Sequence, residues 1–554
     1  MRTTSFFLIG AKLLHFQHKW RELGVLNIVQ EGVKPNWISK EAPKTLQTKS
    51  HFRQFKGTKL EMETYQKALQ EEIDQGIVVE VGPNQIKYLN RTFIIPRKDK
   101  RLRKILDCRP INKQLKDIPF KAENINMVIT LVEKGDWGVT IDIHNAYNHI
   151  MVHPSLQQYL GFAFQDRFYI YKGMPFGLKT APAIFYRHLH PAIQYLRIRG
   201  IRLIVFYDDI LIVCQDPIKL QDHTRIAIQI LEEMGWTISK KSSLNPSQTI
   251  HYLGWIWNLK ELTIQMPQDR RRSILHKVLK YSHLSRNHET VKIKRLAGII
   301  GKLQYLKPQI QRAGLHLKVI LKPFNKVVNQ RGWHSLVRLT PKMNKNWTWW
   351  IAMIRNNQPT NFQILQPEVL LTTDASMRGW GATLLLHKNN QELMSAGKWK
   401  NKWRLTSSNQ RELAAVFCAL RRFANLFREE KIHSIHLRTD NTTTSFNINR
   451  KNSSNSLATL TDWTLRLAEQ MQIQIKATYI PGIENQVADS LSRLNRAGDY
   501  QLNKTTYNSL IKQLKMKPTI DLFASKTNKL TRRYCTITQD QEATARDAFS
   551  IPWT

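Results

Sequence analysis

The feature that most constrains this chain is a set of acidic residues at the ends of short apolar strands. Asp142 closes a predicted strand over 138–142. Asp208 and Asp209 lie between apolar runs 203–206 and 210–213, a pattern that predicts a hairpin with carboxylates at its turn. If the strand ends are neighbours, three carboxylates converge, and oxygen ligands of this kind suit Mg²⁺. For the Asp-Asp pair alone, ordinary turn chemistry is the better interpretation.

The charge of the chain narrows the class of partner. Its 84 Lys and Arg against 42 Asp and Glu give a formal net charge of +42. So basic a surface favours binding to polyanions, above all nucleic acid, although charge alone names a partner and not a reaction. A length of 554 residues predicts several domains. The four cysteines form no C-x-x-C pair, so neither a zinc ribbon nor a disulfide framework is expected.

Hydrophobic periodicity predicts the order of the elements. We expect a helix over 11–30 that packs on the body, and no membrane span, because the apolar stretch near the N-terminus is short and interrupted by charge. The other expectations are a loop over 31–56, a helix over 59–75, short strands over 77–118, a helical basic tract over 270–330, irregular structure over 331–365 and a second α/β unit over 367–495.

Five segments overturn the turn-chemistry interpretation. In this order, they resemble the polymerase domain of retroelement reverse transcriptases. They are RTFIIPRKDKRLRKILDCRPIN (91–112), IDIHNAYNHI (141–150), GMPFGLKTAPAIF (173–185), FYDD (206–209) and GWTISKKSSLNPSQTIHYLG (235–254).

The resemblance implies a role for each matching position. Asp142, Asp208 and Asp209 match the catalytic carboxylates that bind metal, with Asp209 expected to contribute less. Tyr147 matches the bulky residue that excludes the ribose 2′-hydroxyl. The nucleotide-binding positions are Lys98 and Arg103 for the triphosphate, Phe176 and Gly177 where the backbone approaches the nucleotide, and Lys241 as a proton donor to leaving pyrophosphate. For single positions, a purely structural role remains an alternative to nucleotide binding: Tyr147 could be a core aromatic, and Lys98 and Arg103 could belong to a solvated basic turn.

Four later acids form a second constellation. They are Asp374 and Asp440 after apolar strands, and Glu412 and Asp489 in helical runs. This order resembles ribonuclease H (RNase H), in which four carboxylates hold two Mg²⁺ ions that hydrolyse RNA. Two departures from relatives are Asn145 in place of a second aspartate, and the loop 481–484, which has no histidine where many relatives carry one. The second departure puts the rate of RNA cleavage in question.

Together the resemblances imply an α/β multidomain protein: a right-hand polymerase with fingers, palm and thumb, then an RNase H-like mixed-sheet α/β domain. The expected domains are an N-terminal helical extension (1–56), fingers and palm (57–260), a helical thumb (261–330), a connection (331–366), the RNase H-like domain (367–496) and a C-terminal extension without assigned role (497–554).

The implied cofactor is Mg²⁺, two ions per active site, with Mn²⁺ as a substitute. The implied partners are an RNA template, a DNA primer, the RNA–DNA hybrid and deoxynucleoside triphosphates, in the cytoplasm, the nucleus or both. Segments near 16–24, 374–381 and 521–550 resemble the polyprotein of DIRS-like retrotransposons, which use a separately encoded tyrosine recombinase. Two alternatives are a decayed retroelement protein that only binds nucleic acid, and a pararetroviral polymerase, against which the missing D-T-G protease triplet and the end segments speak.

Overall fold

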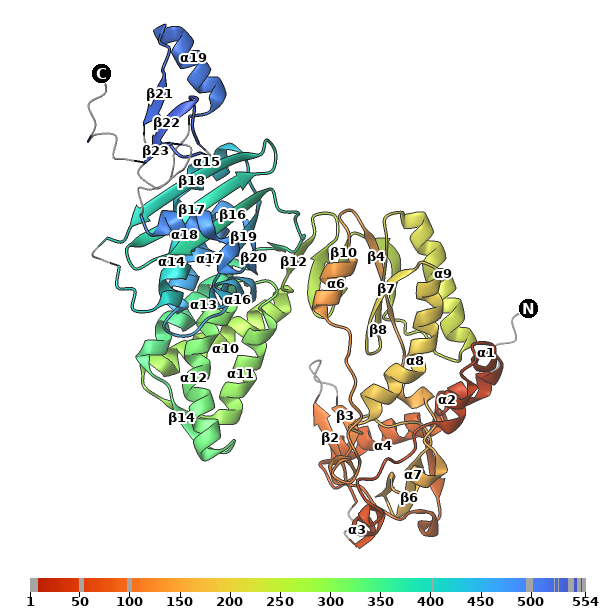
Figure 1. The fold of residues 1–554 in the computed structure, drawn as a ribbon. Coiled ribbons are helices and arrows are strands. Elements are labelled where there is room, and N and C mark those ends of the chain that lie inside the picture. The colour runs from red at the N-terminus through yellow and green to blue at the C-terminus, as the bar shows by residue number, and fades with distance from the viewer. Residues whose placement is uncertain are drawn as a thin grey trace. The chain divides into compact units, whose positions relative to one another are not determined.

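The chain forms two compact units, and each is built from two separate segments. In the computed structural model the first unit comprises residues 1–277 and 351–363, and the second comprises 278–350 and 364–554 (Figure 1). The structure describes residues 8–48, 54–96, 102–400, 403–494, 502–522, 524–526, 528–536, 543–545 and 550.

The centre of the first unit is a four-stranded antiparallel sheet. Its order is β7-β8-β4-β9. The strands are β4 (Trp137–Asp142), β7 (Arg202–Phe206), β8 (Asp209–Cys214) and β9 (Ser243–Ser247). Helices α8 (Ala181–Ile198) and α9 (Pro217–Glu233) pack against it. Ile210, Leu211 and Ile212 are fully buried, so apolar burial on both faces holds β8 in the middle of the sheet.

The first unit also contains a three-stranded antiparallel sheet and a separate hairpin. The sheet contains β1 (Val78–Val81), β5 (Gly161–Phe164) and β6 (Arg167–Tyr171), and the hairpin contains β2 (Thr92–Pro96) and β3 (Leu102–Leu106). Helix α4 (Lys59–Asp74) matches the helix predicted over 59–75. It begins with a capping box, in which Thr58 and Glu61 satisfy each other's backbone N–H groups.

The N-terminal segment packs on the body of this unit, as predicted. Leu13 and Trp20 are fully buried, and Trp20 Nε1 donates to the Met234 carbonyl oxygen at 3.0 Å. The helix expected over 11–30 is divided, and the loop expected over 31–56 contains a helix. The elements are η1 (Lys12–Phe16), α1 (Gln17–Glu22), α2 (Leu26–Glu31) and α3 (Ala42–Thr48). The division falls at Gly24, whose φ of 72° ends α1.

The basic tract is helical, as predicted, and the Trp-rich tract is not irregular. The first contains α10 (Gln268–Arg286), α11 (Ile293–Tyr305) and α12 (Ala313–Arg331). The expectation of irregular structure over 331–365 is wrong, because α13 (Asn344–Asn356) occupies much of it. Trp347, Trp350, Ile351 and Ile354 recur at helical spacing and are buried, so the tryptophans form the apolar face of a helix.

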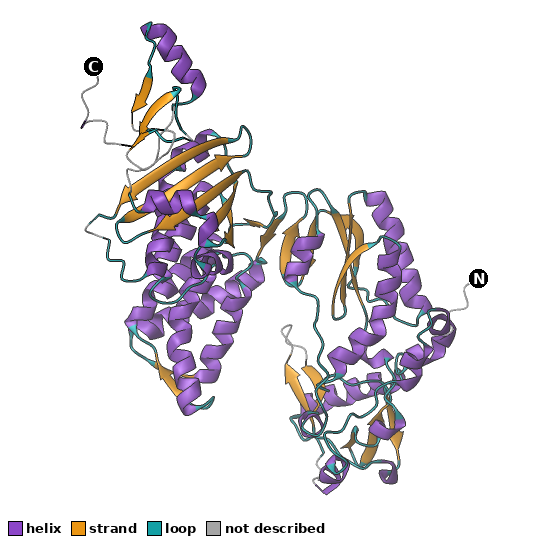
Figure 2. Cartoon of the chain, in the orientation of Figure 1, coloured by secondary structure: helices purple, strands orange, loops and turns teal. Residues whose placement is uncertain are grey.

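The α/β domain predicted over 367–496 contains a mixed sheet, as expected, and this sheet has five strands. Its order is β18-β17-β16-β19-β20, with β16–β19 and β19–β20 parallel and the other pairs antiparallel. The strands are β16 (Val369–Ala375), β17 (Gly379–Leu386), β18 (Gln391–Lys398), β19 (Ser434–Thr439) and β20 (Gln474–Tyr479). The helices around it are α14 (Ser408–Arg422), α15 (Ala424–Glu429), α16 (Thr442–Arg450), α17 (Ala458–Met471) and α18 (Gln486–Ser492) (Figure 2).

The last described residues add a helix and a small parallel sheet. They form α19 (Lys504–Leu514), β21 (Ile520–Leu522), β22 (Arg533–Thr536) and β23 (Thr544–Ala545). Across the described residues, every helix is too short or too polar to cross a membrane.

Candidate active sites in the two units

The sheet of the first unit brings the three predicted polymerase acids together. Asp142, the last residue of β4, pairs in register with Asp209, the first residue of β8. Tyr207 and Asp208 form the turn between β7 and β8, and Tyr207 has a φ of 54°. The Ile143 N–H donates to the Asp208 carbonyl oxygen at 3.3 Å, which ties the end of β4 to this turn. The predicted hairpin with carboxylates at its turn is therefore confirmed.

The charges of these three acids affect one another's pKa values. The pKa of Asp209 is raised to about 6, first by burial and then by the charges of Asp208 and Asp142. Burial is also the largest cause of the raised pKa of Asp208, with a further contribution from Asp142 and an opposing one from Lys241. Partly buried carboxylates that repel one another favour either a proton or a cation. The donor chemistry of these acids therefore suits a divalent metal ion, although their oxygens do not lie at metal-binding spacing.

Aromatic rings line the neighbourhood of these acids. The Tyr147 ring lies 4.7 Å from the Phe176 ring and 5.2 Å from the Phe185 ring, measured between centroids. The pKa of Tyr147 is raised to about 12 by burial and by the charge of Asp208. The Arg103 guanidinium carbon lies 4.5 Å from the centroid of Phe176. Three predicted nucleotide-binding residues, Arg103, Phe176 and Tyr147, thus form one chain of contacts, and the charge of Asp208 acts on its last member, Tyr147.

The backbone conformation after Phe176 explains why residue 177 is a glycine. Gly177 has a φ of 106°, which L side chains rarely adopt. Asn112 holds this loop from both sides: its Nδ2 donates to the Gly177 carbonyl oxygen at 2.8 Å, and its Oδ1 accepts from the Lys179 N–H at 2.8 Å. Gly177 therefore shapes the loop that presents Phe176.

Two predicted nucleotide-binding residues remain, Lys241 and Lys98, and the structure describes only the first of them. Lys241 lies near enough to Asp208 to lower its pKa. Its neighbour Ser242 was not singled out from the sequence. The Ser242 hydroxyl accepts from the Asp142 N–H at 3.0 Å and donates to the Asp142 carbonyl oxygen at 3.3 Å, so it fixes the end of β4. Lys98 lies outside the described residues.

Three of the four acids predicted in the second unit form a tight cluster. Asp374 is the second-last residue of β16, Asp440 follows β19, and Glu412 lies in α14. One carboxylate oxygen of each lies within 4.8 Å of the others. Since β16 and β19 are parallel, their carboxyl ends meet at the same edge of the sheet. Among the described residues this is the acid set with metal-binding spacing; Asp142, Asp208 and Asp209 do not form such a set.

Glu412 is the most perturbed member of this cluster. Its pKa is raised to about 9, chiefly by burial and then by Asp374 and Asp440. Its Oε2 is buried and has no hydrogen-bond partner. The pKa of Asp374 is raised to about 6 for the same main reason. A buried carboxylate oxygen without a donor, beside two other acids, is what a bound divalent cation would satisfy.

Asp489 lies near the cluster but is held by an arginine. Its charge raises the pKa values of Asp374 and Asp440. Both of its oxygens accept hydrogen bonds from Arg493, at 2.7 to 3.0 Å. Asn485, which sequence reasoning did not assign, donates to Asp374 Oδ1 at 3.2 Å and is fully buried. Its signal was its place four residues before Asp489, immediately before a helical run.

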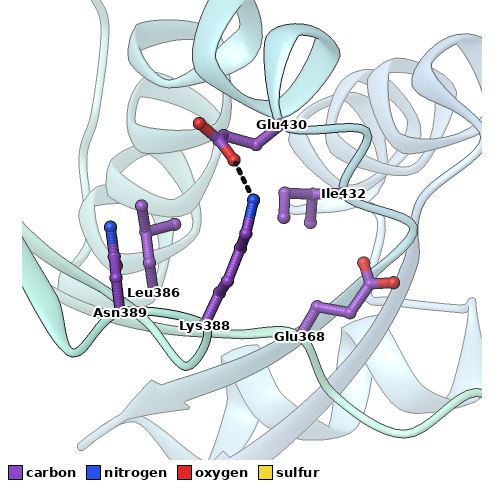
Figure 3. A pocket seen from close by; sticks show the side chains of 6 residues that line it. All are labelled: Glu368, Leu386, Lys388, Asn389, Glu430 and Ile432. Carbon is purple, nitrogen blue, oxygen red and sulfur yellow. Dashed lines mark ion pairs between the residues drawn. The ribbon is translucent and has the colours of Figure 1, made fainter.

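A small pocket in the second unit lies away from these acids. Its volume is about 240 Å³, and Lys388 and Glu430 form an ion pair of 3.7 Å across it (Figure 3). Glu368 lines it just before β16 begins, whereas Asp374 lies near the other end of that strand. The pocket contains none of the predicted site residues.

Two parts of the chain match known protein families, one around each group of acids. Residues 95–257 match the family described as reverse transcriptase (RNA-dependent DNA polymerase). Residues 365–470 match the RNase H-like domain found in reverse transcriptase.

Individual relatives are distant in sequence. The chain is 23% identical over 449 residues to the enzymatic polyprotein of Figwort mosaic virus, with 78% of this chain and 62% of that protein covered. It is 23% identical over 428 residues to the retrovirus-related Pol polyprotein from transposon gypsy of Drosophila melanogaster, with 75% and 39% covered. The chain thus spans less than two thirds of these curated relatives.

Among solved structures, the foamy viral protease-reverse transcriptase dRH in complex with double-stranded DNA superposes with a TM-score of 0.50 at 14% identity. The match covers 87% of this chain and 84% of that one, and it supports the fold. The chain therefore contains a region that matches the reverse transcriptase family, followed by an RNase H-like region with a mixed α/β sheet.

Proposed function

We propose that the chain synthesises DNA on RNA and DNA templates at its first acidic centre and hydrolyses the RNA strand of RNA–DNA hybrids at its second. Two observations carry the proposal: Asp142 and Asp209 pair at the ends of β4 and β8, and Asp374, Glu412 and Asp440 lie within 4.8 Å of one another; burial and mutual repulsion raise the carboxyl pKa values of Asp209 and Glu412.

For DNA synthesis, Asp142 and Asp208 would hold the metal, with a lesser part for Asp209. Two bound Mg²⁺ ions supply activation of the attacking oxygen and stabilisation of the leaving one in phosphoryl transfer. Arg103 and Lys98 would bind the triphosphate by charge-assisted hydrogen bonds. Tyr147 would exclude a 2′-hydroxyl.

Lys241 would place a proton donor near the leaving pyrophosphate. Its charge already acts on Asp208. A lysine in this position offers an ammonium proton at the point where negative charge develops.

For RNA cleavage, Asp374, Glu412 and Asp440 would hold Mg²⁺, and Mn²⁺ is a candidate substitute. Asp489 would join them after release from Arg493, which makes the Asp489–Arg493 pair a feature of the resting site. The loop 481–484, in which many relatives carry a histidine, has none; its Glu484 pairs with Arg438 at 3.1 Å. Slow product release would follow from that difference.

A primer-extension assay tests the first activity. An oligo(dT) primer on poly(rA) with Mg²⁺ should be extended by the wild-type chain and not by the Asp208→Asn variant. Equal signals from the two proteins would favour the alternative, a decayed retroelement protein that only binds nucleic acid. The net charge of +42 supports that alternative. It does not explain why acids are present at all the predicted catalytic positions of both regions.

We further propose that the chain belongs to a DIRS-like element, with an RNA template, a DNA primer and deoxynucleoside triphosphates as its partners and a separately encoded tyrosine recombinase for integration in the nucleus. The segments near 16–24, 374–381 and 521–550 support this proposal. Sequencing of the flanking DNA tests it: a recombinase reading frame beside this gene is expected, and an aspartic protease with an integrase of another class would contradict it.

A further inference from the structure

Lys104 is a buried cation that the proposed mechanism does not use. It lies in β3, and its side chain is 1% exposed. Its ammonium forms an ion pair with Glu72 of α4 and donates to the Tyr171 hydroxyl at 3.0 Å. Burial lowers the pKa of Lys104, and Glu72 opposes this shift. A charged group so deeply buried is costly unless it is paired, which here Glu72 achieves.

Three aromatic rings complete the surroundings of this ammonium. Its nitrogen lies 4.2 Å from the centroid of Phe162, 5.2 Å from that of Tyr171 and 5.6 Å from that of Tyr65. Rings at these distances attract a cation through their negative faces, and more strongly where water is excluded. We call Glu72, Tyr65, Phe162 and Tyr171 the Lys104 cage.

The cage joins the β2–β3 hairpin to the rest of the first unit. Among the described residues the two strands pair only with each other. A two-stranded hairpin is marginally stable by itself, so its position depends on side-chain attachments. Besides Lys104, the Tyr65 hydroxyl donates to Thr92 Oγ1 at 2.8 Å, where both residues are buried. Both attachments lead to α4.

The alternation of the strand links the cage to the nucleotide site. Successive side chains of a strand point to opposite faces. Lys104 and Leu106 are buried against the body, whereas Arg103 is only partly buried and lies on Phe176. A fixed Lys104 therefore fixes the direction in which its neighbour Arg103 points.

We propose that Lys104 is a positioning residue for the incoming deoxynucleoside triphosphate, acting through the cage to aim Arg103 at the phosphates. This inference rests on the proposed polymerase function. Lys104 does not contact the nucleotide; the cage sets the geometry of a residue that does. A merely structural lysine would stabilise the unit without any specific coupling to Arg103.

A double-mutant cycle tests the coupling. Primer extension is measured with wild type, Lys104→Met, Arg103→Ala and the double variant, with deoxynucleotide concentration varied. Lys104→Met is expected to raise KM for the nucleotide about tenfold and to change kcat less than about twofold. In the Arg103→Ala background the same change should raise KM less than about twofold, because Arg103 is no longer there to be positioned.

Controls separate positioning from loss of folding. Lys67→Met alters an exposed lysine of the same α4 helix and should leave KM unchanged. Affinity for the template–primer, measured by fluorescence anisotropy, should be equal in wild type and Lys104→Met. If Lys104→Met does not fold, Tyr171→Phe replaces it in the cycle, because it removes one hydrogen bond of the Lys104 ammonium and keeps its ion pair with Glu72; a smaller rise in KM is expected, and it should again disappear without Arg103.

An equal rise in KM with and without Arg103, or no rise at all, would overturn the positioning role. A wild-type chain that extends no primer would instead overturn the proposed function. The two failures are therefore distinguishable in one experiment.

Discussion

Asp142 and Asp209 face each other as register partners at the ends of β4 and β8. This pairing places Asp208, in the adjoining turn, beside both. We expect Asp142→Asn to lower the rate of primer extension at least about a hundredfold, because a metal ligand and a charge are lost at the reacting centre. RNA cleavage by the same preparation should persist. Asp166→Asn, in an exposed turn, is the control; similar losses in both variants would contradict a role for Asp142.

The second centre should fail separately. Asp374→Asn removes one of three clustered acids, and we expect it to abolish degradation of a labelled RNA–DNA hybrid while leaving primer extension intact. Gel analysis of the RNA strand and of the extended primer reports both activities from one reaction. Loss of both together would mean that the two centres are not independent.

Tyr147 should govern the choice of sugar. Its ring packs on Phe176 and Phe185. Tyr147→Ala removes the ring, and we expect incorporation of ribonucleotides relative to deoxynucleotides to rise about 10- to 200-fold. Tyr147→Phe keeps the ring and should keep the discrimination. Equal selectivity in all three proteins would leave Tyr147 as a core aromatic only.

Glu412 should make the stability of the metal-free protein depend on pH. Burial, followed by Asp374 and Asp440, raises its pKa from 4.5 to about 9 in the folded chain. The unfolded chain therefore loses this proton first as pH rises. Stability from this group is complete below about pH 4.5 and is lost progressively toward pH 9, by at most about 1.4 kcal/mol per pH unit.

Thermal unfolding in the presence of a chelator measures this dependence. Glu412→Gln cannot ionise and should flatten the decline between about pH 5 and 9, leaving the smaller contribution of Asp374, whose pKa is raised to about 6. Added Mg²⁺ should stabilise the wild type more at the alkaline end, because it binds the ionised carboxylates. Identical pH profiles for wild type and Glu412→Gln would refute the assignment.

Arg312 should be a main determinant of stability in the second unit. Its side chain is 10% exposed and donates to Asp462 and Glu469, each at 2.7 Å. Burial opposes ionisation of Asp462, but hydrogen bonds from His316 and Arg312 hold its pKa at about 2.

Arg312→Met would remove the guanidinium that bonds both Asp462 and Glu469. We expect a loss of about 3–5 kcal/mol in the free energy of unfolding, measured in urea. Arg331→Met, at the exposed end of the same helix, should change it by less than about 0.5 kcal/mol. Comparable losses in the two variants would contradict a special role for Arg312.

Strands that end in acids were predictable because the signal is local. Runs such as 203–206 and 369–371 are apolar, and the acid within three residues after each marks the end of the strand. Packing between distant segments determined structure that local sequence patterns did not predict, and α13 is an example. The tryptophans of α13 suggested irregular structure until their spacing was matched to a buried helical face.

The details of the sites depended on contacts between distant segments. Ser242 reaches Asp142 from 100 residues away, and Asn485 reaches Asp374 from 111. No pattern within either segment announces its partner. The pairing of Asp489 with Arg493 has the spacing of one helical turn, yet only the structure shows that the arginine, and not the other acids, holds it.

The first unit is completed by residues 351–363, which follow 73 residues that belong to the second. In it, β15 (Thr360–Asn361) pairs with β12 (Thr263–Gln265), and Arg271 donates to the carbonyl oxygens of Ile354 and Arg355. During synthesis, the first unit therefore cannot close its last sheet until the ribosome has passed residue 361. A polymerase fragment cut at residue 330 would expose the open edge of β12, a template for aggregation, whereas one that keeps the returning segment would not.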